Sequence, residues 1–289
     1  MKKTSQLLLA KTIGFYLNFL SILNLEKAKN VSYRLFSQPR KGKLKKERLP
    51  KILQTAKQET IQFGEDFFQI YTWNNSKTEQ SEANKDIILL VHGWESNASR
   101  WKKMLPHLKQ LNKTIIAIDA PAHGLSSGKE FNAPKYAEFI GEFSKKYSPK
   151  IMIGHSIGGA AICYFLHKYK NQEVEKIVML GSPSEFKIMS DNFINLLGLN
   201  SKIQKALENH YYEKFDIDIN DFSGHLFAKQ FNHKAFIAHD LHDEIVKIDE
   251  GRKYASHWQN ATFIETSGLG HSMHDDDLYQ MIKQFITKT

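Results

Sequence analysis

The sequence has almost no cysteine, and it lacks a long apolar run that is free of charge. Cys163 is the only cysteine among 289 residues, so no disulfide can form within the chain and no Cys-x-x-Cys pair exists for a thiolate zinc site. Collagen-like and low-complexity segments are also absent, since aromatic residues make up 12% of the chain. The composition excludes disulfide-rich, fibrous and wholly disordered proteins, and it leaves a globular fold.

Positive charge is concentrated at one end of the chain. The formal net charge is +9, yet residues 1–58 carry +12 and residues 59–289 carry −3. A nucleic-acid-binding domain would carry its basic residues on its own folded body, and this body is slightly acidic. We therefore expect no nucleic-acid partner, and we divide the chain into a basic extension, 1–58, and a folded domain, 59–289.

Residues 7–23 are mostly apolar, but the segment is short for a bilayer span and contains Lys11. No cleavage site of the kind that follows a secretory signal comes after it. Two alternatives remain open: a helix that lies in a membrane interface, or a helix that docks on the protein's own surface or on a partner. The first predicts peripheral membrane contact through residues 1–48 and a cytoplasmic location at the inner face of the membrane. It is favoured by the basic residues that follow, Arg40, Lys41, Lys43, Lys45, Lys46 and Arg48.

After Pro50, short apolar runs alternate with amphipathic stretches, which is typical of a mostly parallel sheet with helices on both faces. The first two strands, joined by a Gly-Glu-Asp turn, are expected to be antiparallel. The periodicity also predicts helices, the first of which contains Pro106 and should be distorted there. The expected strands are 61–63, 67–73, 86–92, 113–119, 150–154, 176–181, 234–239 and 261–265, and the expected helices are 101–111, 134–143, 159–168 and 278–285.

One connection is too long for a simple crossover. About fifty residues separate the expected strands 176–181 and 234–239, and they contain two helical stretches, 192–197 and 201–211. A segment of this length inside a compact domain is unusual without structure of its own. We expect a helical cap at about 184–233.

The strand 150–154 leads into Gly154-His155-Ser156-Ile157-Gly158, a Gly-x-Ser-x-Gly motif that opens a helix. Small neighbours are needed because the serine lies on a sharp strand-to-helix turn. The predicted position at a strand end is the context in which this motif indicates a nucleophile. Ser156 is therefore the candidate nucleophile.

A serine hydroxyl needs a base and an orienting carboxylate, which should follow later in the chain. His271 follows Gly268 and Gly270 in the loop after the last strand, and it is favoured over His274 as the base. Asp243 and Asp240 follow the strand 234–239. Asp243 is favoured as the acid because it lies further out, whereas Asp240 at the strand end can bond to loop backbone.

An oxyanion hole requires two backbone N–H groups. We expect one from Ile157, which follows the nucleophile, and one from Trp94 in the loop after the strand 86–92. The Trp94 side chain is open to two interpretations, lining the acyl pocket or packing under the cap.

Two other kinds of site are disfavoured. The sequence His239-Asp240-Leu241-His242-Asp243 resembles a metal cluster, but alternate strand residues face opposite ways and no partner motif exists. The glycines around Ser156 lack the Lys-Ser/Thr ending of a phosphate loop. We expect neither a metal nor a cofactor.

At these residues the chain resembles the α/β-hydrolase fold superfamily, in its serine esterase and lipase branch. The resemblance covers about residues 60–289 and implies an eight-stranded sheet, a cap between strands six and seven, and the order Ser156, Asp243, His271 for the catalytic triad. It disfavours the dehalogenase and epoxide-hydrolase branches, which have an aspartate at the nucleophile position. Ala122 departs from the glycine usual in a supporting loop. The motifs that carry the resemblance are 92–94, 119–126, 154–159, 240–246 and 270–271.

The function expected from these residues is hydrolysis of a small carboxylic ester through an acyl-enzyme on Ser156, in the manner of a carboxylesterase. Thioester or C–C bond hydrolysis are variants that the triad does not distinguish. The alternative from another class is a hydrolase-like ligand-binding or sensor module with slow chemistry. Deletion of residues 1–48 is expected to leave turnover largely unchanged.

Overall fold

The computed structural model describes residues 2–73 and 86–288 and divides into two compact units. Unit 1 comprises residues 1–38 and 185–223, and unit 2 comprises residues 39–184 and 224–289. The N-terminal boundary therefore lies at 38 rather than at the expected 58, because Leu53 is buried in the core of unit 2. The cap insertion is also shorter than 184–233, since helix α9 (Gly224–Ala228) belongs to unit 2.

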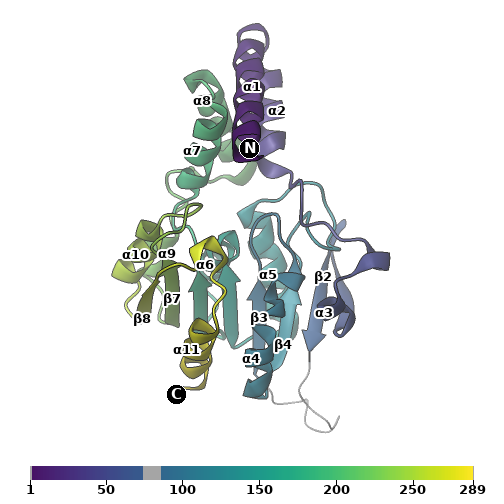
Figure 1. Ribbon diagram of the computed structural model, residues 1–289, viewed down its shortest axis with the longest axis vertical. Helices are drawn as coiled ribbons and strands as arrows, with labels where there is room; N and C mark the ends of the chain where they lie inside the picture. The colour runs from purple at the N-terminus through teal and green to yellow at the C-terminus, as the bar shows by residue number, and fades with distance from the viewer. Residues whose placement is uncertain (1, 74–85, 289) are drawn as a thin grey trace. The chain divides into compact units, whose positions relative to one another are not determined.

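Unit 2 is built on one eight-stranded sheet with the strand order β1-β2-β4-β3-β5-β6-β7-β8 (Figure 1). Strand β2 is antiparallel to both of its neighbours, and the other pairs are parallel. Each expected strand is confirmed, with bounds that shift by a few residues. The strands are β1 (Lys57–Phe63), β2 (Asp66–Trp73), β3 (Ile87–Val91), β4 (Thr114–Ile118), β5 (Ile151–His155), β6 (Lys176–Leu180), β7 (Lys234–Asp240) and β8 (Ala261–Thr266).

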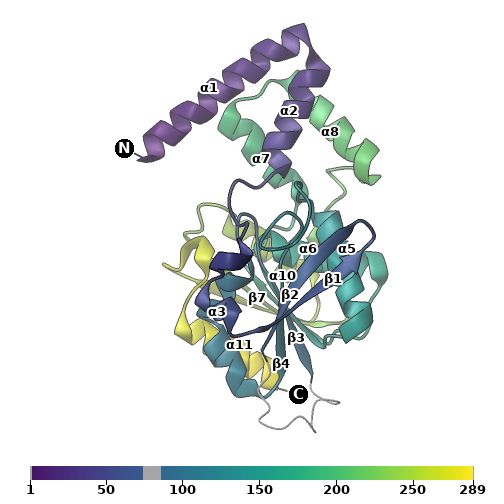
Figure 2. The same ribbon diagram turned by 90° about the vertical axis from the view of Figure 1, so that its right-hand side faces the viewer.

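Helices cover both faces of this sheet (Figure 2). One face packs against α3 (Lys51–Gln54), α4 (Leu105–Leu108) and α11 (Asp276–Thr287), and the other against α5 (Ala133–Tyr147), α6 (Ile157–Tyr169) and α10 (Ile248–His257). The short 3₁₀ turns of this unit are η1 (Lys46–Arg48), η3 (Ala98–Lys102), η4 (Lys109–Leu111) and η5 (Gly270–Ser272). Since the strands between the helix layers are almost continuously apolar, both faces are buried, as parallel sheets require.

The helix expected over 101–111 does not form as one element. The segment is divided into η3, the four-residue helix α4 and η4, with Pro106 in the first turn of α4. Proline has no N–H to donate and its ring clashes with the preceding turn, so it can begin a helix but not continue one. Trp101, Leu105 and Leu108 nevertheless reach the core, as the periodicity predicted.

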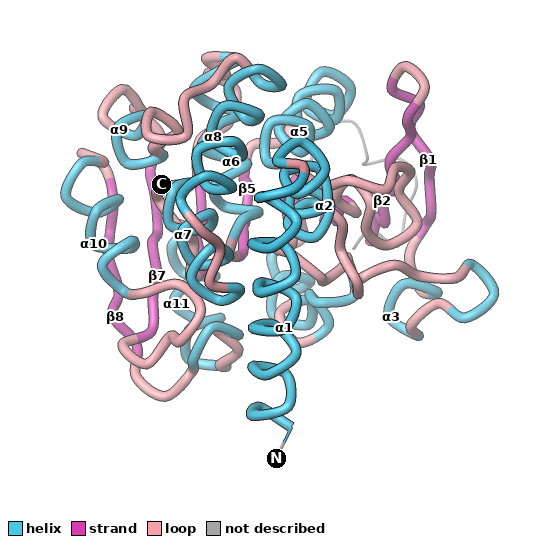
Figure 3. The backbone as a smooth tube through the Cα atoms, turned by 90° about the horizontal axis from the view of Figure 1, so that it is seen from above, coloured by secondary structure: helices cyan, strands magenta, loops and turns pink. Residues whose placement is uncertain are grey.

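Unit 1 consists of four helices from two distant segments: α1 (Lys2–Leu23), α2 (Leu25–Ser37), α7 (Phe186–Leu197) and α8 (Ser201–Phe215). Figure 3 shows α1 running beside α7, and α2 contacts both α1 and α8. Leu17, Ile203 and Leu207 are fully buried between them. Of the alternatives for residues 7–23, docking on the protein's own surface is therefore observed for one face of α1. Within residues 2–73 and 86–288, no helix combines the length and the apolar character needed to cross a bilayer.

We expect Gly14→Ala to loosen the crossing of α1 and α7. A Cβ at Gly14 would lie 1.8 Å from the carbonyl oxygen of Leu197, a backbone atom, so one helix must move. Overpacking of this kind costs about 1–3 kcal/mol. Limited proteolysis should cleave α1 faster in this variant, whereas Thr12→Ala on the exposed face of α1 should leave the rate unchanged. Equal rates for the two variants would contradict the close crossing.

Candidate active site

Ser156 lies on the sharp turn between β5 and α6. Its backbone angles, φ 54° and ψ −131°, are strained for a residue with a side chain, as is typical of a nucleophile on such a turn. The turn is tight enough that a Cβ at Gly154 would lie 2.5 Å from Cα of Gly159. The small residues that the motif supplies are therefore a steric requirement.

The structure brings Ser156, His271 and Asp243 together in a chain of hydrogen bonds. His271 Nε2 lies 3.0 Å from Ser156 Oγ, and His271 Nδ1 lies 2.8 Å from Asp243 Oδ2. Since an ionised carboxylate only accepts, Nδ1 carries the proton and Nε2 is free to accept from the serine hydroxyl. The arrangement is that of a nucleophile, a base and an orienting acid.

The side chain of Asp243 is fully buried, and burial by itself would raise the pKa of its carboxyl group. Hydrogen bonds from His239, His271 and the backbone N–H of Val246 outweigh burial and hold this pKa below its ordinary value. The Ile245 N–H, 2.8 Å from Oδ1, adds a further donor. The carboxylate therefore stays ionised throughout the range in which an imidazole titrates.

The two rival residues have other partners. Asp240 Oδ2 accepts from the Leu269 N–H and from Thr266 Oγ1, both at 2.9 Å, so it ties the end of β7 to the loop that carries His271. His274 bonds through Nδ1 to the Tyr279 hydroxyl, and burial lowers its pKa to about 4. The expectation that Asp240 bonds to loop backbone is confirmed.

Of the two expected oxyanion donors, Ile157 directly follows the nucleophile, and Trp94 follows a glycine that lies close to it. As the first residue of α6, Ile157 has no acceptor for its N–H within the helix. The segment before Trp94 is close as well, because a Cβ at Gly93 would lie 3.0 Å from Cβ of Ser156. The Trp94 ring packs edge-on against His123 and Phe131, with ring centroids 5.5 and 5.4 Å away.

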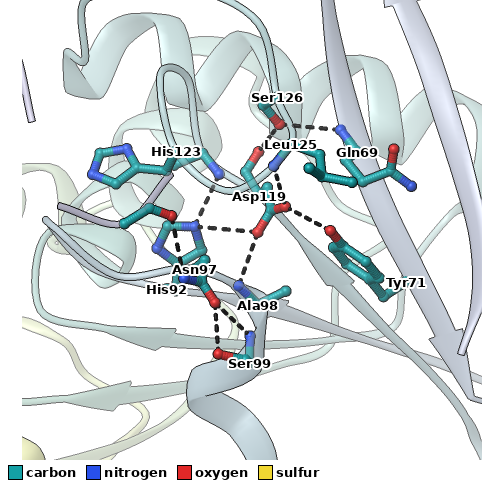
Figure 4. Close-up of polar contacts among 12 residues, drawn as sticks. Gln69, Tyr71, His92, Asn97, Ala98, Ser99, Asp119, His123, Leu125 and Ser126 are labelled. Atoms are coloured by element: carbon teal, nitrogen blue, oxygen red, sulfur yellow. Dashed lines mark hydrogen bonds and ion pairs between the residues drawn. The ribbon is translucent and has the colours of Figure 1, made fainter. Parts of the chain in front are cut away.

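The loop that carries Trp94 is held by a buried carboxylate, Asp119, at the end of β4 (Figure 4). Oδ1 accepts the Ala98 N–H at 2.8 Å, and Oδ2 accepts the Leu125 N–H at 2.9 Å and the Tyr71 hydroxyl at 3.0 Å. Burial raises the pKa of Asp119, while these donors oppose the rise. One carboxylate thus joins the loops that follow β3 and β4.

Two neutral histidines complete this support. His92 Nε2 accepts the Ala120 N–H, and His123 Nε2 accepts the Glu95 N–H, each at 3.0 Å. Their Nδ1–H groups donate to the carbonyls of Gly93 and Pro121. Both rings must stay unprotonated at Nε2, and burial lowers the pKa of His92 well below its usual value. Both residues belong to motifs named in the sequence analysis, but no role was predicted for them. Their position in the loops that follow two neighbouring strands is the sequence feature that could have indicated one.

His123 should make the protein less stable in mild acid. Burial lowers its pKa to about 4 in the folded state, whereas an unfolded histidine has a pKa near ~6.5. The unfolded chain therefore binds the extra proton first, and the free energy of unfolding falls as pH drops through this window, by about 1.4 kcal/mol per pH unit for one proton. Urea unfolding of His123→Gln between about pH 6.5 and 4 should show a slope shallower by that amount. An unchanged slope would mean that His123 is not the proton acceptor.

Residues 40–44, here called the strap, also contact the loops around the site. The Arg40 backbone N–H and Nε both donate to Glu95 Oε1, at 3.0 and 3.2 Å, and Lys43 Nζ donates to the Ser126 carbonyl at 2.6 Å. Arg40 and Lys43, two of the basic residues expected to favour lipid contact, thus form hydrogen bonds within unit 2. Deleting 1–48 would remove the strap, so we now expect that deletion to lower turnover.

The other histidines of the 239–243 motif have separate environments. His239 Nε2 bonds to the Val246 carbonyl at 2.9 Å and lies 3.5 Å from Asp243 Oδ2, so it contacts the acid. The His242 side chain is 69% exposed. In the part of the chain that the structure describes, no group of three or more His, Cys, Asp and Glu side chains could hold a metal ion. Cys163 is buried on α6, and burial raises the pKa of its thiol to about 12.

Comparison with known proteins gives the same fold. A family model described as "alpha/beta hydrolase fold" matches residues 86–207. The human "Serine hydrolase-like protein" is 33% identical over 116 residues, which are 38% of this chain and 56% of that protein. "Monoacylglycerol lipase" of Mycolicibacterium smegmatis is 24% identical over 97 residues, 30% of this chain and 35% of the lipase. Mouse "Alpha/beta hydrolase domain-containing protein 10" superposes with a TM-score of 0.59 at 15% identity, covering 80% of this chain and 97% of that structure.

The chain has the α/β-hydrolase fold, as its motifs indicated, and residues 86–207 are similar to that family's model. Its sequence relatives include serine hydrolase-like proteins and esterases or lipases. The matched segment spans only 36% to 56% of the human serine hydrolase-like proteins.

Proposed function

We propose that the protein is a serine hydrolase that cleaves small carboxylic esters through an acyl-enzyme. The observation that carries this proposal is the continuous hydrogen-bonded chain from Ser156 Oγ through His271 to Asp243. The hydrogen bond to the Asp243 carboxylate favours a proton on His271 Nδ1 and leaves Nε2 to accept from Ser156, and the proposed oxyanion donors are the N–H groups of Ile157 and Trp94.

The steps follow from the geometry. Ser156 Oγ attacks the ester carbonyl while its proton passes to His271 Nε2, and Asp243 stabilises the imidazolium that forms. The N–H groups of Ile157 and Trp94 stabilise the oxyanion, a contribution of about 3 kcal/mol for each donor. His271 then gives the proton to the departing alcohol oxygen. Water attacks the acyl carbon with His271 again as the base, and the carboxylic acid leaves as Ser156 regains its proton.

Full-length protein should hydrolyse p-nitrophenyl esters and react with a fluorophosphonate probe at Ser156. A panel of esters with increasing acyl length, together with one acyl thioester, would define the substrate class. Folded protein that neither turns over any of these compounds nor takes the label would contradict the proposal and favour the alternative, a ligand-binding or sensor module with slow chemistry.

We also propose that α1 makes a peripheral membrane contact, which would place the protein at the inner face of the membrane. One face of α1 packs on α2 and α7, and the rest of the helix exposes several large apolar side chains. The helix contains no acidic residue, and residues 1–38 hold six basic side chains against Glu26, so the charge complements an anionic lipid surface. The exposed side chains are Leu7, Leu8, Leu9, Phe15, Tyr16, Phe19, Ile22 and Leu23, each more than half exposed.

Sedimentation with vesicles tests this contact. Full-length protein should bind phosphatidylserine-containing vesicles more than neutral ones, and the triple variant Phe15→Ser, Phe19→Ser, Ile22→Ser should lose binding. Tyr212→Ser, which removes an exposed aromatic side chain from α8, is the matched control and should still bind. A protein that stays in solution with both vesicles would contradict the proposal. A dimer that the triple variant dissociates would assign the face to a second copy instead.

A further inference from the structure

The loop that carries His271 has little regular structure to fix it. Gly268, Gly270 and Met273 all have left-handed backbone angles, with φ of 87°, 58° and 52°. Between them lies only the short turn η5. The position of the imidazole therefore depends on which groups hold the backbone of this loop.

Two side chains from different elements donate to consecutive carbonyls of the loop. His155 Nε2 lies 2.7 Å from the carbonyl oxygen of His271, and Arg100 Nη2 lies 2.8 Å from that of Ser272. His155 ends β5 directly before Ser156, while Arg100 belongs to η3, beyond the expected oxyanion segment. The base is thus tied to the nucleophile's own strand and to the neighbouring loop.

The protonation state of His155 follows from this contact. A carbonyl oxygen can only accept, so Nε2 must carry the proton. Burial lowers the pKa of His155 far below its usual value, which keeps the ring neutral and leaves Nδ1 as a bare acceptor. Nδ1 is buried and has no hydrogen-bond partner among the described residues. An unsatisfied buried nitrogen is costly, so fold stability alone does not account for histidine at this position.

Burial of Arg100 is also energetically unfavourable. Its Nε is buried without a hydrogen-bond partner among the described residues, and no carboxylate is among the groups that shift its pKa. Burial lowers the pKa of the guanidinium to about 10, so it remains charged at neutral pH. Hydrogen bonds from a charged donor are stronger than those between neutral groups. The carbonyl of Ser272 is therefore held firmly.

We infer that His155 and Arg100 are positioning residues for the base, forming a carbonyl clamp on residues 271 and 272. This inference rests on the proposed function of His271. The clamp holds the loop so that Nε2 stays at 3.0 Å from Ser156 Oγ while Nδ1 stays at 2.8 Å from Asp243. A displacement of about 1 Å at a reacting group can cost about 10²-fold in rate.

The clamp is tested with paired substitutions in the full-length protein. His155→Leu and Arg100→Met remove the donors, whereas His155→Gln and Arg100→Lys keep an N–H near the same place. In His155→Leu and Arg100→Met, we expect kcat for a p-nitrophenyl ester to fall about 10- to 100-fold while KM stays within about twofold of the wild type. In His155→Gln and Arg100→Lys, we expect most of the lost kcat to be restored. The inference would be overturned if His155→Leu and Arg100→Met lost stability but kept kcat per folded molecule. It would also be overturned if the conservative variants did not restore kcat.

A second readout does not need turnover. The proton that His271 Nδ1 shares with Asp243 should give a downfield proton resonance, assigned by its absence in His271→Ala. We expect it to broaden or shift in His155→Leu and Arg100→Met and to persist in their conservative partners. If no ester is cleaved but the resonance responds in this way, the proposed function fails and the clamp stands. If neither the resonance nor kcat changes in His155→Leu and Arg100→Met, the clamp is contradicted and the proposed function is unaffected.

Discussion

Ser156→Ala is expected to abolish ester turnover and fluorophosphonate labelling together. Without the hydroxyl no acyl-enzyme can form, and only the proposed oxyanion donors and the binding surface remain. Loss of a nucleophile of this kind lowers kcat by about 10⁴-fold or more. Initial rates with p-nitrophenyl esters, measured alongside intact-protein mass spectrometry after labelling, would give both quantities.

Ser256→Ala is the matched control for this substitution, since Ser256 is an exposed serine on α10, outside the hydrogen-bonded chain of the site. It should label and turn over substrate like the wild type. Residual turnover above about 1% in Ser156→Ala, with a clean label elsewhere, would point to a different nucleophile.

Asp243→Asn should lower kcat by about 10⁴-fold at neutral pH while the protein remains folded. The amide cannot carry the charge that stabilises the imidazolium, and its NH₂ group favours the tautomer of His271 that has no proton on Nδ1. Because the pKa of Asp243 lies below its ordinary value, lowering the pH is an inefficient way to remove this charge. Substitution is therefore the cleaner way to test the role of the carboxylate.

Asp240→Asn separates this effect from general damage to the loop. Asp240 is also buried and also bonds to the loop of His271, but through Leu269 and Thr266. Its substitution should lower the melting temperature and change kcat far less than Asp243→Asn does. If both variants lost activity equally, the assignment of the acid would not hold.

The sequence was sufficient for the sheet and for the three residues of the proposed triad. Buried parallel strands read as continuous apolar runs, and Ser156 and Asp243 each follow such a run. His271 follows the partly exposed edge strand β8, so the convergence of the three at one sheet edge could be predicted from the order of the strands. The prediction of one continuous helix over 101–111 was wrong. Periodicity indicates which residues face the core, but it does not indicate where a proline interrupts the helix.

Other features depend on contacts between distant segments that no local pattern encodes. His155 and Arg100 donate to residues more than a hundred positions away in the chain. Arg40 and Lys43 were interpreted as favouring contact with a membrane interface, yet the strap pairs them with Glu95 and the Ser126 carbonyl. A basic side chain has the same sequence signature whether it faces lipid, solvent or a carbonyl.

The composition of unit 1 has a consequence for synthesis. Helices α1 and α2 end by residue 38, and the segment that forms the rest of their unit begins at residue 185. At about 5–20 residues per second, the ribosome needs on the order of 10–30 s to make the intervening chain. During that time α7 and α8 are missing, so Leu17 and its neighbours have only α2 to cover them. The nascent N-terminal hairpin is thus the part of this chain most exposed to premature association, and its folding must wait for the middle of the protein.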